Sequence, residues 1–127
     1  MLDIWILMAL KAEGLVDRNK IMAIVFLLER AYGLTKTCFV PGRIPWSRDV
    51  ETALRRLVEI GLIEELPERA YRLTEEGRRA VEKIPMKDPK FRYSYADIKF
   101  FTRWDLDSLV EYIRLNYPQY AAVSLCV

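Results

Sequence analysis

The chain has 127 residues and a mass of 15.0 kDa, of which 52% are hydrophobic and 30% charged. This length and composition fit one globular domain and exclude a disordered chain and most two-domain architectures. The formal net charge is only +2 and histidine is absent, which excludes a strongly basic surface overall and every site that needs an imidazole.

Two apolar helices are predicted at the start of the chain. Residues 2–13 form the first, which is apolar nearly all round and is therefore buried or interfacial. Residues 18–32 form the second, which begins after the N-cap Asp17 and ends at Gly33. Its centre, 21–28, has no polar face, which predicts the central helix of the core.

The N-terminal segment does not predict targeting to a membrane. It is apolar, but it carries Asp3 and no basic region ahead of the apolar stretch, unlike a signal peptide. The longest uninterrupted apolar run, 21–28, is far too short to span a bilayer. We therefore expect a cytoplasmic protein without a membrane partner. Abundant arginine with scarce glutamine and asparagine is typical of a thermophile.

A long connection follows at 33–46, where two prolines and a glycine forbid a continuous helix. Within it, 37–40 is predicted as a short strand. The stretch 30–48 contains basic residues and no acidic one. It is the first of two locally basic stretches.

A helix followed at once by a hairpin is predicted in the middle of the chain. Ser47 caps the helix 48–60, whose apolar side chains form one stripe at helical spacing. Residues 62–66 and 71–73 are predicted as two strands joined by the turn 67–70, which makes a β-hairpin.

Two more helices are predicted after the hairpin, separated by an irregular segment. Thr74 caps a helix at 75–84, and 85–97 is expected to be irregular because it contains two prolines. A last helix spans about 105–117. Its candidate N-caps are Thr102, Asp105 and Ser108. The basic residues around the irregular segment alternate with aromatic ones and form the second basic stretch: Arg78, Arg79, Lys83, Lys87, Lys90 and Arg92.

These elements predict a mainly α fold with a small β-hairpin, of the winged-helix (winged helix-turn-helix) type, with an added C-terminal helix. Residues 1–84 are expected to form the winged-helix-like domain. Residues 85–127 are expected to form a C-terminal extension whose one helix packs on the same domain, so that the whole is a single compact domain.

Several segments resemble known families. The run ALRRLVEIGLIEEL at 53–66, followed by YRLTEEG at 71–77, resembles the third helix, wing and following helix of winged-helix regulators. VDRNKIMAIVFLLER at 16–30, GRIPWSRD at 42–49 and DSLVEYIRLNYPQY at 107–120 resemble the uncharacterised YwgA-type proteins and the related Panacea, or SocA-like, domain.

The second resemblance implies a winged-helix-like fold with a regulatory or adaptor role. The Panacea relatives include antitoxin or proteolysis-adaptor proteins, which act through protein contacts. The chain departs from their Gly-Pro-x-Ser/Pro pattern before the third helix, where it has Ile44-Pro-Trp-Ser47.

The helix 48–60 is the predicted DNA-reading helix, because such helices meet base edges with their N-terminal residues. Two features oppose this. The connection before it is far longer than the turn of about 3–4 residues in a helix-turn-helix. The charges of the helix sum to zero and the hairpin is net negative, whereas phosphate contacts need positive charge.

The predicted nucleic-acid-binding residues are Lys36, Arg43, Trp46, Arg48, Thr52, Arg55, Arg56, Arg69 and Arg72. The alternative for both basic stretches is a solvated rim whose aromatic residues cover the core.

We interpret the chain as a winged-helix transcriptional regulator that binds double-stranded DNA as a homodimer. The residues predicted for the dimer interface are Trp5, Met8, Leu10, Leu109 and Ile113. The alternative is a protein-interaction module, adaptor or antitoxin-like, on the same scaffold and without nucleic acid. The near-neutral helix and the acidic hairpin favour this alternative. A winged-helix fold does not by itself decide between the two functions.

Enzyme chemistry is poorly supplied by this sequence. The adjacent pairs Glu64–Glu65 and Glu75–Glu76 do not converge as a catalytic dyad must, and no glycine-rich phosphate loop is present. Cys38 and Cys126 cannot form a zinc site alone, and we expect two buried apolar thiols, with a disulfide between them as the alternative. We expect no catalytic site, cofactor or metal.

Overall fold

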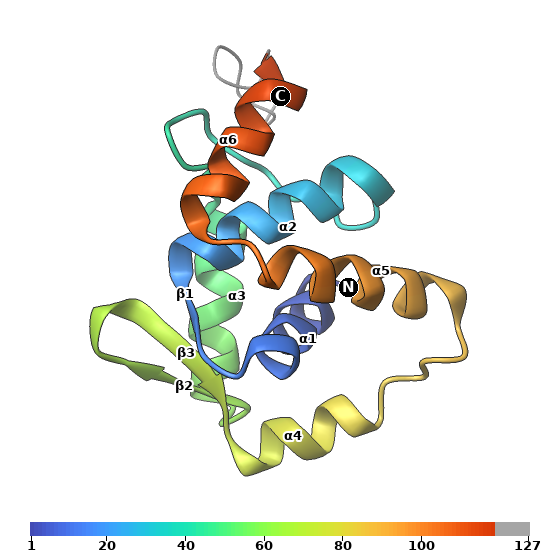
Figure 1. Ribbon diagram of the computed structural model, residues 1–127. Coiled ribbons are helices and arrows are strands. Elements are labelled where there is room, and N and C mark those ends of the chain that lie inside the picture. The colour runs from blue at the N-terminus through green and yellow to red at the C-terminus, as the bar shows by residue number, and fades with distance from the viewer. Residues whose placement is uncertain (119–127) are drawn as a thin grey trace.

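The computed structural model describes residues 1–118, which contain six α-helices and one small antiparallel sheet (Figure 1). The helices are α1 (Leu2–Glu13), α2 (Arg18–Tyr32), α3 (Arg48–Glu59), α4 (Glu75–Glu82), α5 (Pro89–Thr102) and α6 (Leu106–Asn116). The strands are β1 (Val16–Asp17), β2 (Ile63–Leu66) and β3 (Ala70–Leu73), in the order β1-β3-β2. The prediction of a mainly α fold with a hairpin is confirmed.

The core is built around α1 and α2. Every residue of 20–29 in α2 is buried, so the prediction of a central helix is confirmed. Trp5 in α1 and Phe26 in α2 are completely buried, and each such side chain contributes about 1.5–3 kcal/mol by leaving water. Lys20 and Glu29, at the two ends of this buried stretch, are its charged residues. The ammonium of Lys20 has two partners. It donates to Glu13 at 2.9 Å and to the carbonyl of Thr102 at 2.7 Å, which satisfies it inside the core.

Polar caps fix where α2, α3, α4 and α6 begin, and α5 has such a cap as well. The side chains of Asp17, Ser47, Thr74 and Asp105 each accept a backbone N–H from the first turn of α2, α3, α4 and α6. Each cap satisfies a backbone donor that would otherwise lack a partner. The three predicted caps before α2, α3 and α4 are confirmed, and Asp105 is the correct candidate of the three for α6.

The hairpin of β2 and β3 carries an additional strand that the sequence did not predict. Its predicted strands are confirmed, with Glu65 opposite Tyr71. β1 pairs with the outer side of β3 through only two residues, Val16 and Asp17. A strand of two residues is too short to show the alternation of apolar and polar residues by which strands are recognised in a sequence.

The prediction of an irregular segment at 85–97 is wrong. Asp88 caps α5 through the backbone N–H of Lys90 at 3.0 Å, and Pro89 occupies the first helical turn, where no N–H is needed. The part of the chain after α4 therefore has two helices rather than the predicted one.

α5 packs along α1, as Figure 1 shows. It is also tied to α2 because the hydroxyl of Tyr32 donates to Asp97. Burial, together with this bond, raises the pKa of Tyr32 from 10.0 to about 12.

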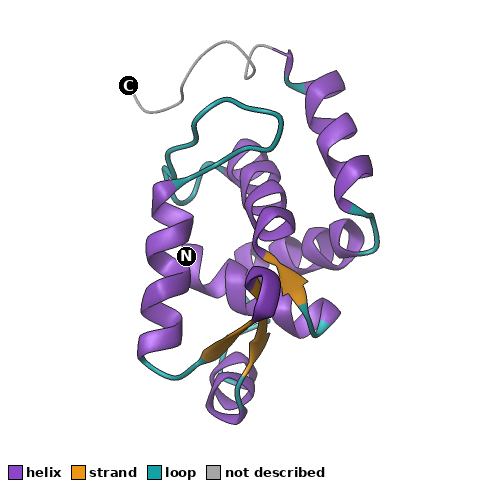
Figure 2. Ribbon diagram, turned by 90° about the vertical axis from the view of Figure 1, so that its left-hand side faces the viewer, coloured by secondary structure: helices purple, strands orange, loops and turns teal. Residues whose placement is uncertain are grey.

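The long connection between α2 and α3 folds back on itself. The predicted strand at 37–40 is wrong, since only Val40 pairs, by an isolated bridge to Trp46. Phe39 is completely buried edge-on against Phe26, with 5.3 Å between ring centroids. Figure 2 shows the connection arching above α3, which runs along one side of the molecule down to the strands.

Two further expectations concern the cysteines and the membrane. Cys38 is half-buried and is disulfide-bonded, which corrects the expectation of a free buried thiol; Cys126 lies outside the described residues. Among residues 1–118, no helix combines the length and apolar character needed to cross a bilayer.

Candidate nucleic-acid interface

The outer face of α3 carries the central residues of the predicted interface. The inner face of this helix packs into the core through residues such as Leu54 and Leu57, which are completely buried. Arg48, Thr52 and Arg55 follow one another at helical spacing on the opposite side, and all three are exposed. The amphipathic pattern of the sequence therefore places an uncovered polar ridge on α3.

A hollow of about 450 Å³ lies on one side of this ridge, between α3, the start of α1 and the long connection. We call it the loop-side hollow. Its lining residues are Leu2, Thr35, Lys36, Thr37, Arg48, Asp49, Thr52 and Arg56. It brings together four of the predicted residues, with three cationic side chains among them.

A second hollow, of about 260 Å³, lies between α3 and the hairpin. We call it the wing-side hollow. Its lining residues are Glu51, Leu54, Arg55, Val58, Glu65, Arg69 and Tyr71. It brings the predicted residues Arg55 and Arg69 together, so the ridge of α3 is flanked on both sides by predicted binding residues.

Three predicted arginines of this face are held in ion pairs. Arg56 pairs with Asp3 of α1, and Arg72 pairs with Glu64 across the hairpin without lining either hollow. Arg69 lies 3.7 Å from the carboxylate of Glu51. Exposed pairs such as those of Arg56 and Arg72 stabilise a protein by about 0–1 kcal/mol, so a stronger anion can replace their carboxylates at little cost. Glu51 is less accessible, because its side chain is only 22% exposed.

Three other cations on this face have no such partner. Lys36, Arg48 and Arg55 make no ion pair with any other residue of 1–118. The first two line the loop-side hollow and the third lines the wing-side hollow. These positions are where an incoming anion meets the least competition from the protein's own carboxylates.

A partly buried network around Glu51, which sequence reasoning missed, connects the hairpin to the helices. Glu51 accepts from Arg18 of α2 at 2.6 Å and also faces Arg69. The hydroxyl of Tyr71 donates to Glu65 at 2.6 Å. Burial is the main cause that raises the pKa of Tyr71 above its ordinary value, and this hydrogen bond is the second. These partners come from separate elements, so no local sequence pattern could reveal them.

Two predicted residues lie apart from the others. Arg43 pairs with Asp107 at the start of α6 at 3.1 Å, and it lines neither hollow. Trp46 is 40% exposed and bonds through its backbone to Val40, so it belongs to the turn of the connection. The path of the connection separates these side chains from the ridge of α3.

The predicted dimer interface requires a correction. The five side chains proposed for it are buried inside the chain, with exposed fractions of 0–5%: Trp5, Met8, Leu10, Leu109 and Ile113. A helix that is apolar nearly all round is buried here by the other elements of the same chain, because α1 contacts α2, α3, α4 and α5. These residues are therefore not available on the surface to a second copy.

The second basic stretch is combined with aromatic rings. The ammonium of Lys90 lies 5.1 Å from the ring centroid of Phe91, and the guanidinium of Arg92 lies 5.1 Å from that of Tyr93. Phe91 is 8% exposed, as expected of a residue that covers the core, whereas Tyr93 is 56% exposed. This stretch runs from α4, which holds Arg78 and Arg79, into α5, which holds Lys90 and Arg92, and it contributes no residue to either hollow beside α3.

No family model, curated protein or solved structure matches the chain. Within residues 1–118, no three Cys, Asp or Glu side chains are grouped so that they could hold a metal ion.

Proposed function

We propose that the chain is a winged-helix DNA-binding protein that acts as a transcriptional regulator. The observation that carries this proposal is the exposed ridge of Arg48, Thr52 and Arg55 on α3, flanked by the loop-side and wing-side hollows. In this proposal α3 enters the major groove, and its N-terminal residues meet base edges.

The order of the elements supports this proposal. Helix α1, strand β1 and helices α2 and α3 precede the hairpin, and the sheet order is β1-β3-β2. The hairpin then lies along α3, with Arg69 of its turn 3.7 Å from Glu51 in the first turn of the helix, and in this proposal it is the wing that contacts the DNA backbone. This arrangement agrees with the resemblance of 53–77 to winged-helix regulators.

Charge supports a weak, salt-sensitive interaction. Lys36, Arg48 and Arg55, which make no ion pair within residues 1–118, can meet phosphates directly, and counterion release then favours binding. Arg56 can exchange its partner Asp3 for a phosphate, which forms the stronger bidentate pair. The guanidinium of Arg69 is 62% exposed and lies 3.7 Å from Glu51, so it can also reach a phosphate.

The test is a titration of a labelled DNA duplex at a series of salt concentrations. We expect affinity to fall steeply with salt, and Arg48→Ala and Arg55→Ala each to reduce the slope of log K against log salt by about 0.9. Arg114→Ala is the matched control, because Arg114 is an exposed arginine of α6 that pairs with Glu111.

Two outcomes would contradict the proposal. The first is no binding even at low salt, because a regulator of this kind needs a non-specific electrostatic contact. The second is an equal loss on Arg114→Ala, which would place the contact away from α3.

A protein-interaction module, adaptor or antitoxin-like, is the second candidate. The observation that favours it is the end of α3 nearest the hairpin, where Val58 is 36% and Ile60 is 60% exposed. Val58 also shares the wing-side hollow with the acidic side chains of Glu51 and Glu65, and such a mixture of apolar and acidic groups repels phosphates and suits a protein partner. The absence of DNA binding in the titration above is the result that favours this candidate.

A further inference from the structure

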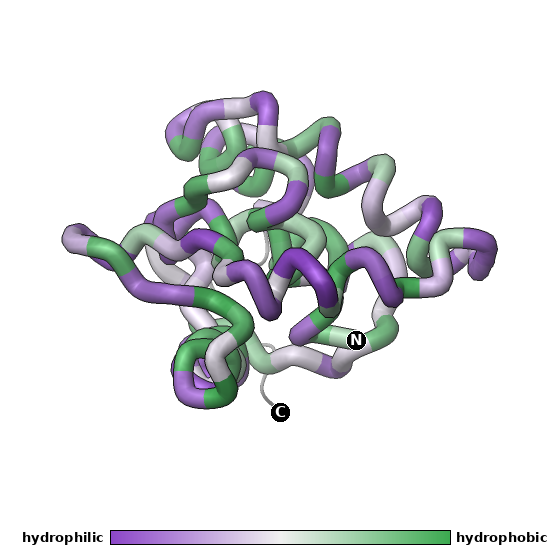
Figure 3. Tube along the Cα trace, turned by 90° about the horizontal axis from the view of Figure 1, so that it is seen from below, coloured by the Kyte–Doolittle hydropathy of each residue, from purple (hydrophilic) through white to green (hydrophobic). Residues whose placement is uncertain are grey.

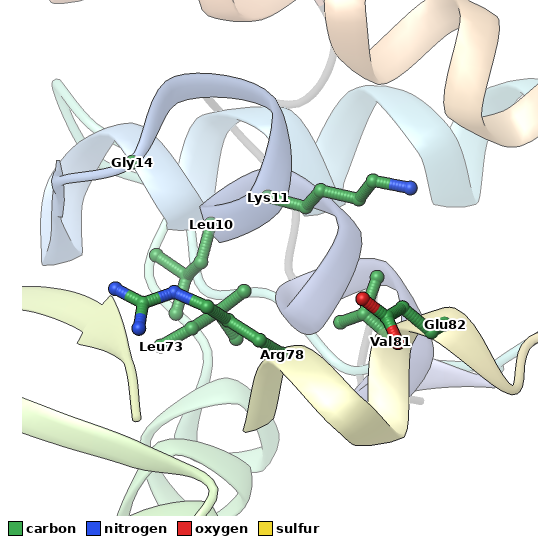
Figure 4. A pocket seen from close by; sticks show the side chains of 7 residues that line it. All are labelled: Leu10, Lys11, Gly14, Leu73, Arg78, Val81 and Glu82. Atoms are coloured by element: carbon green, nitrogen blue, oxygen red, sulfur yellow. The ribbon is translucent and has the colours of Figure 1, made fainter. Parts of the chain in front are cut away.

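A hollow separate from the α3 face lies between the C-terminal end of α1 and α4. It measures about 320 Å³, within the range of small-molecule sites. Its lining residues are Leu10, Lys11, Gly14, Leu73, Arg78, Val81 and Glu82 (Figure 4). We call it the α1–α4 hollow. None of these residues belongs to the α3 face, so a ligand held there is independent of DNA binding.

The floor of the α1–α4 hollow is apolar and firmly placed. Leu10, Leu73 and Val81 are 1%, 8% and 4% exposed, and they come from α1, the end of β3 and α4. The sequence of α4 is otherwise hydrophilic, as Figure 3 shows for this helix at the front of the view from below. Gly14 adds no side chain, and a Cβ there would meet nothing within 4 Å, which keeps that edge open.

The charged groups are placed around this floor and not on it. Figure 4 shows the guanidinium of Arg78 at one end of the hollow, with the ammonium of Lys11 and the carboxylate of Glu82 toward the other. Lys11 is already engaged, because its ammonium lies 5.2 Å from the ring centroid of Tyr95. Arg78 makes no ion pair with any residue of 1–118, so it is the cation left to receive a ligand.

We propose that the α1–α4 hollow binds a small amphipathic monoanion, such as a medium-chain carboxylate. The alkyl body lies on Leu10, Leu73 and Val81, where it removes apolar surface from water. The carboxylate meets the guanidinium of Arg78, whose planar fork suits two parallel hydrogen bonds. The far end holds both Glu82 and Lys11 and so has no excess positive charge to attract a second anionic group, which favours a ligand with one.

The test uses octanoate as the probe and octanamide as its neutral analogue, with the full chain observed by NMR. We expect saturable shifts at the methyl groups of Leu10, Leu73 and Val81, with a dissociation constant of about 1 mM or lower for a ligand of this size. Arg78→Gln is expected to weaken octanoate binding about tenfold, because it removes the charge-assisted bonds, and to leave octanamide binding unchanged.

Arg79→Gln is the matched control, because Arg79 is the next residue of α4 and pairs with Glu75 outside the hollow. It should change octanoate binding less than twofold. Val81→Trp should abolish binding of both probes by filling the space. The proposal is overturned if octanoate produces no saturable shifts at these methyl groups, if octanamide binds as tightly, or if Arg79→Gln weakens binding as much as Arg78→Gln.

Discussion

Single residues set how closely the elements of this protein approach, and Gly77 is the clearest case. It lies in the first turn of α4, where its N–H is bonded to the cap Thr74 at 3.1 Å. A Cβ on Gly77 would lie 1.9 Å from the backbone carbonyl oxygen of Leu62. That backbone atom cannot move away easily, because Leu62 also accepts the N–H of Thr74 at 3.1 Å.

Gly77→Ala is therefore expected to lower the free energy of unfolding by about 1–3 kcal/mol, the cost of forcing a packed contact apart. Urea unfolding followed by circular dichroism measures it. Gly42→Ala is the control, because a Cβ there meets only the carbonyl oxygen of Ile44 at 3.5 Å, an ordinary contact. It should be neutral or raise the free energy of unfolding by up to about 1 kcal/mol. Equal effects of the two substitutions would contradict the steric argument.

At the scale of elements, the connection between α2 and α3 is held by one buried carboxylate. Glu29, near the end of α2, is 8% exposed and accepts the backbone N–H groups of Thr35 and Lys36, each at 3.0 Å. Lys36 has a φ of 51°, a conformation that costs free energy outside glycine. The carboxylate therefore holds in place the segment that lines the loop-side hollow.

Glu29→Ala is expected to lower the free energy of unfolding by about 1–3 kcal/mol, because it leaves these donors without their acceptor. Hydrogen exchange should show lost protection at the amides of Thr35 and Lys36. Glu59→Ala removes an exposed glutamate of α3 and should change the free energy of unfolding by no more than about 0.5 kcal/mol. Unchanged exchange at both amides in Glu29→Ala would show that the connection is held by other contacts.

The elements that could be predicted from sequence are those whose signals are local. Asp17, Ser47 and Thr74 each precede an apolar pattern at helical spacing, and each caps a helix in the structure. The helix 89–102 escapes prediction because two prolines suggest breaks, although Asp88 followed by Pro89 is also a good helix start. The apolar character of α1 is plain in the sequence, but whether its apolar face meets the same chain or a second copy depends on tertiary packing.

The candidate site likewise contains some residues that the sequence groups together and others that only the fold brings together. Arg48, Thr52 and Arg55 could be grouped from sequence because helical spacing alone places them on one face. The position of Lys36 beside them, and of Arg43 away from them at Asp107, depends on the path of the connection. That path is fixed by contacts between distant residues, such as Phe39 with Phe26, which a single sequence does not reveal.

At the scale of the whole molecule, the net charge of +2 matters less than its distribution. Asp3 of α1 neutralises Arg56 beside the loop-side hollow, whereas Asp107 of α6 neutralises Arg43 away from both hollows. Both are exposed enough to be replaced by a neutral side chain without emptying the core. Asp3→Asn and Asp107→Asn therefore raise the net charge by the same amount, the first beside the loop-side hollow and the second away from both hollows.

If DNA binds the α3 face, Asp3→Asn is expected to raise its affinity at low salt and to steepen the slope of log K against log salt by up to about 0.9, because it frees Arg56 for a phosphate. Asp107→Asn should leave the slope nearly unchanged. The measurement is the same duplex titration, after circular dichroism has shown that both variants fold. Equal effects of the two would mean that only the net charge matters, and they would argue against α3 as the binding helix. A steeper slope in Asp3→Asn alone would place the phosphates beside α3, since the two proteins carry the same total charge.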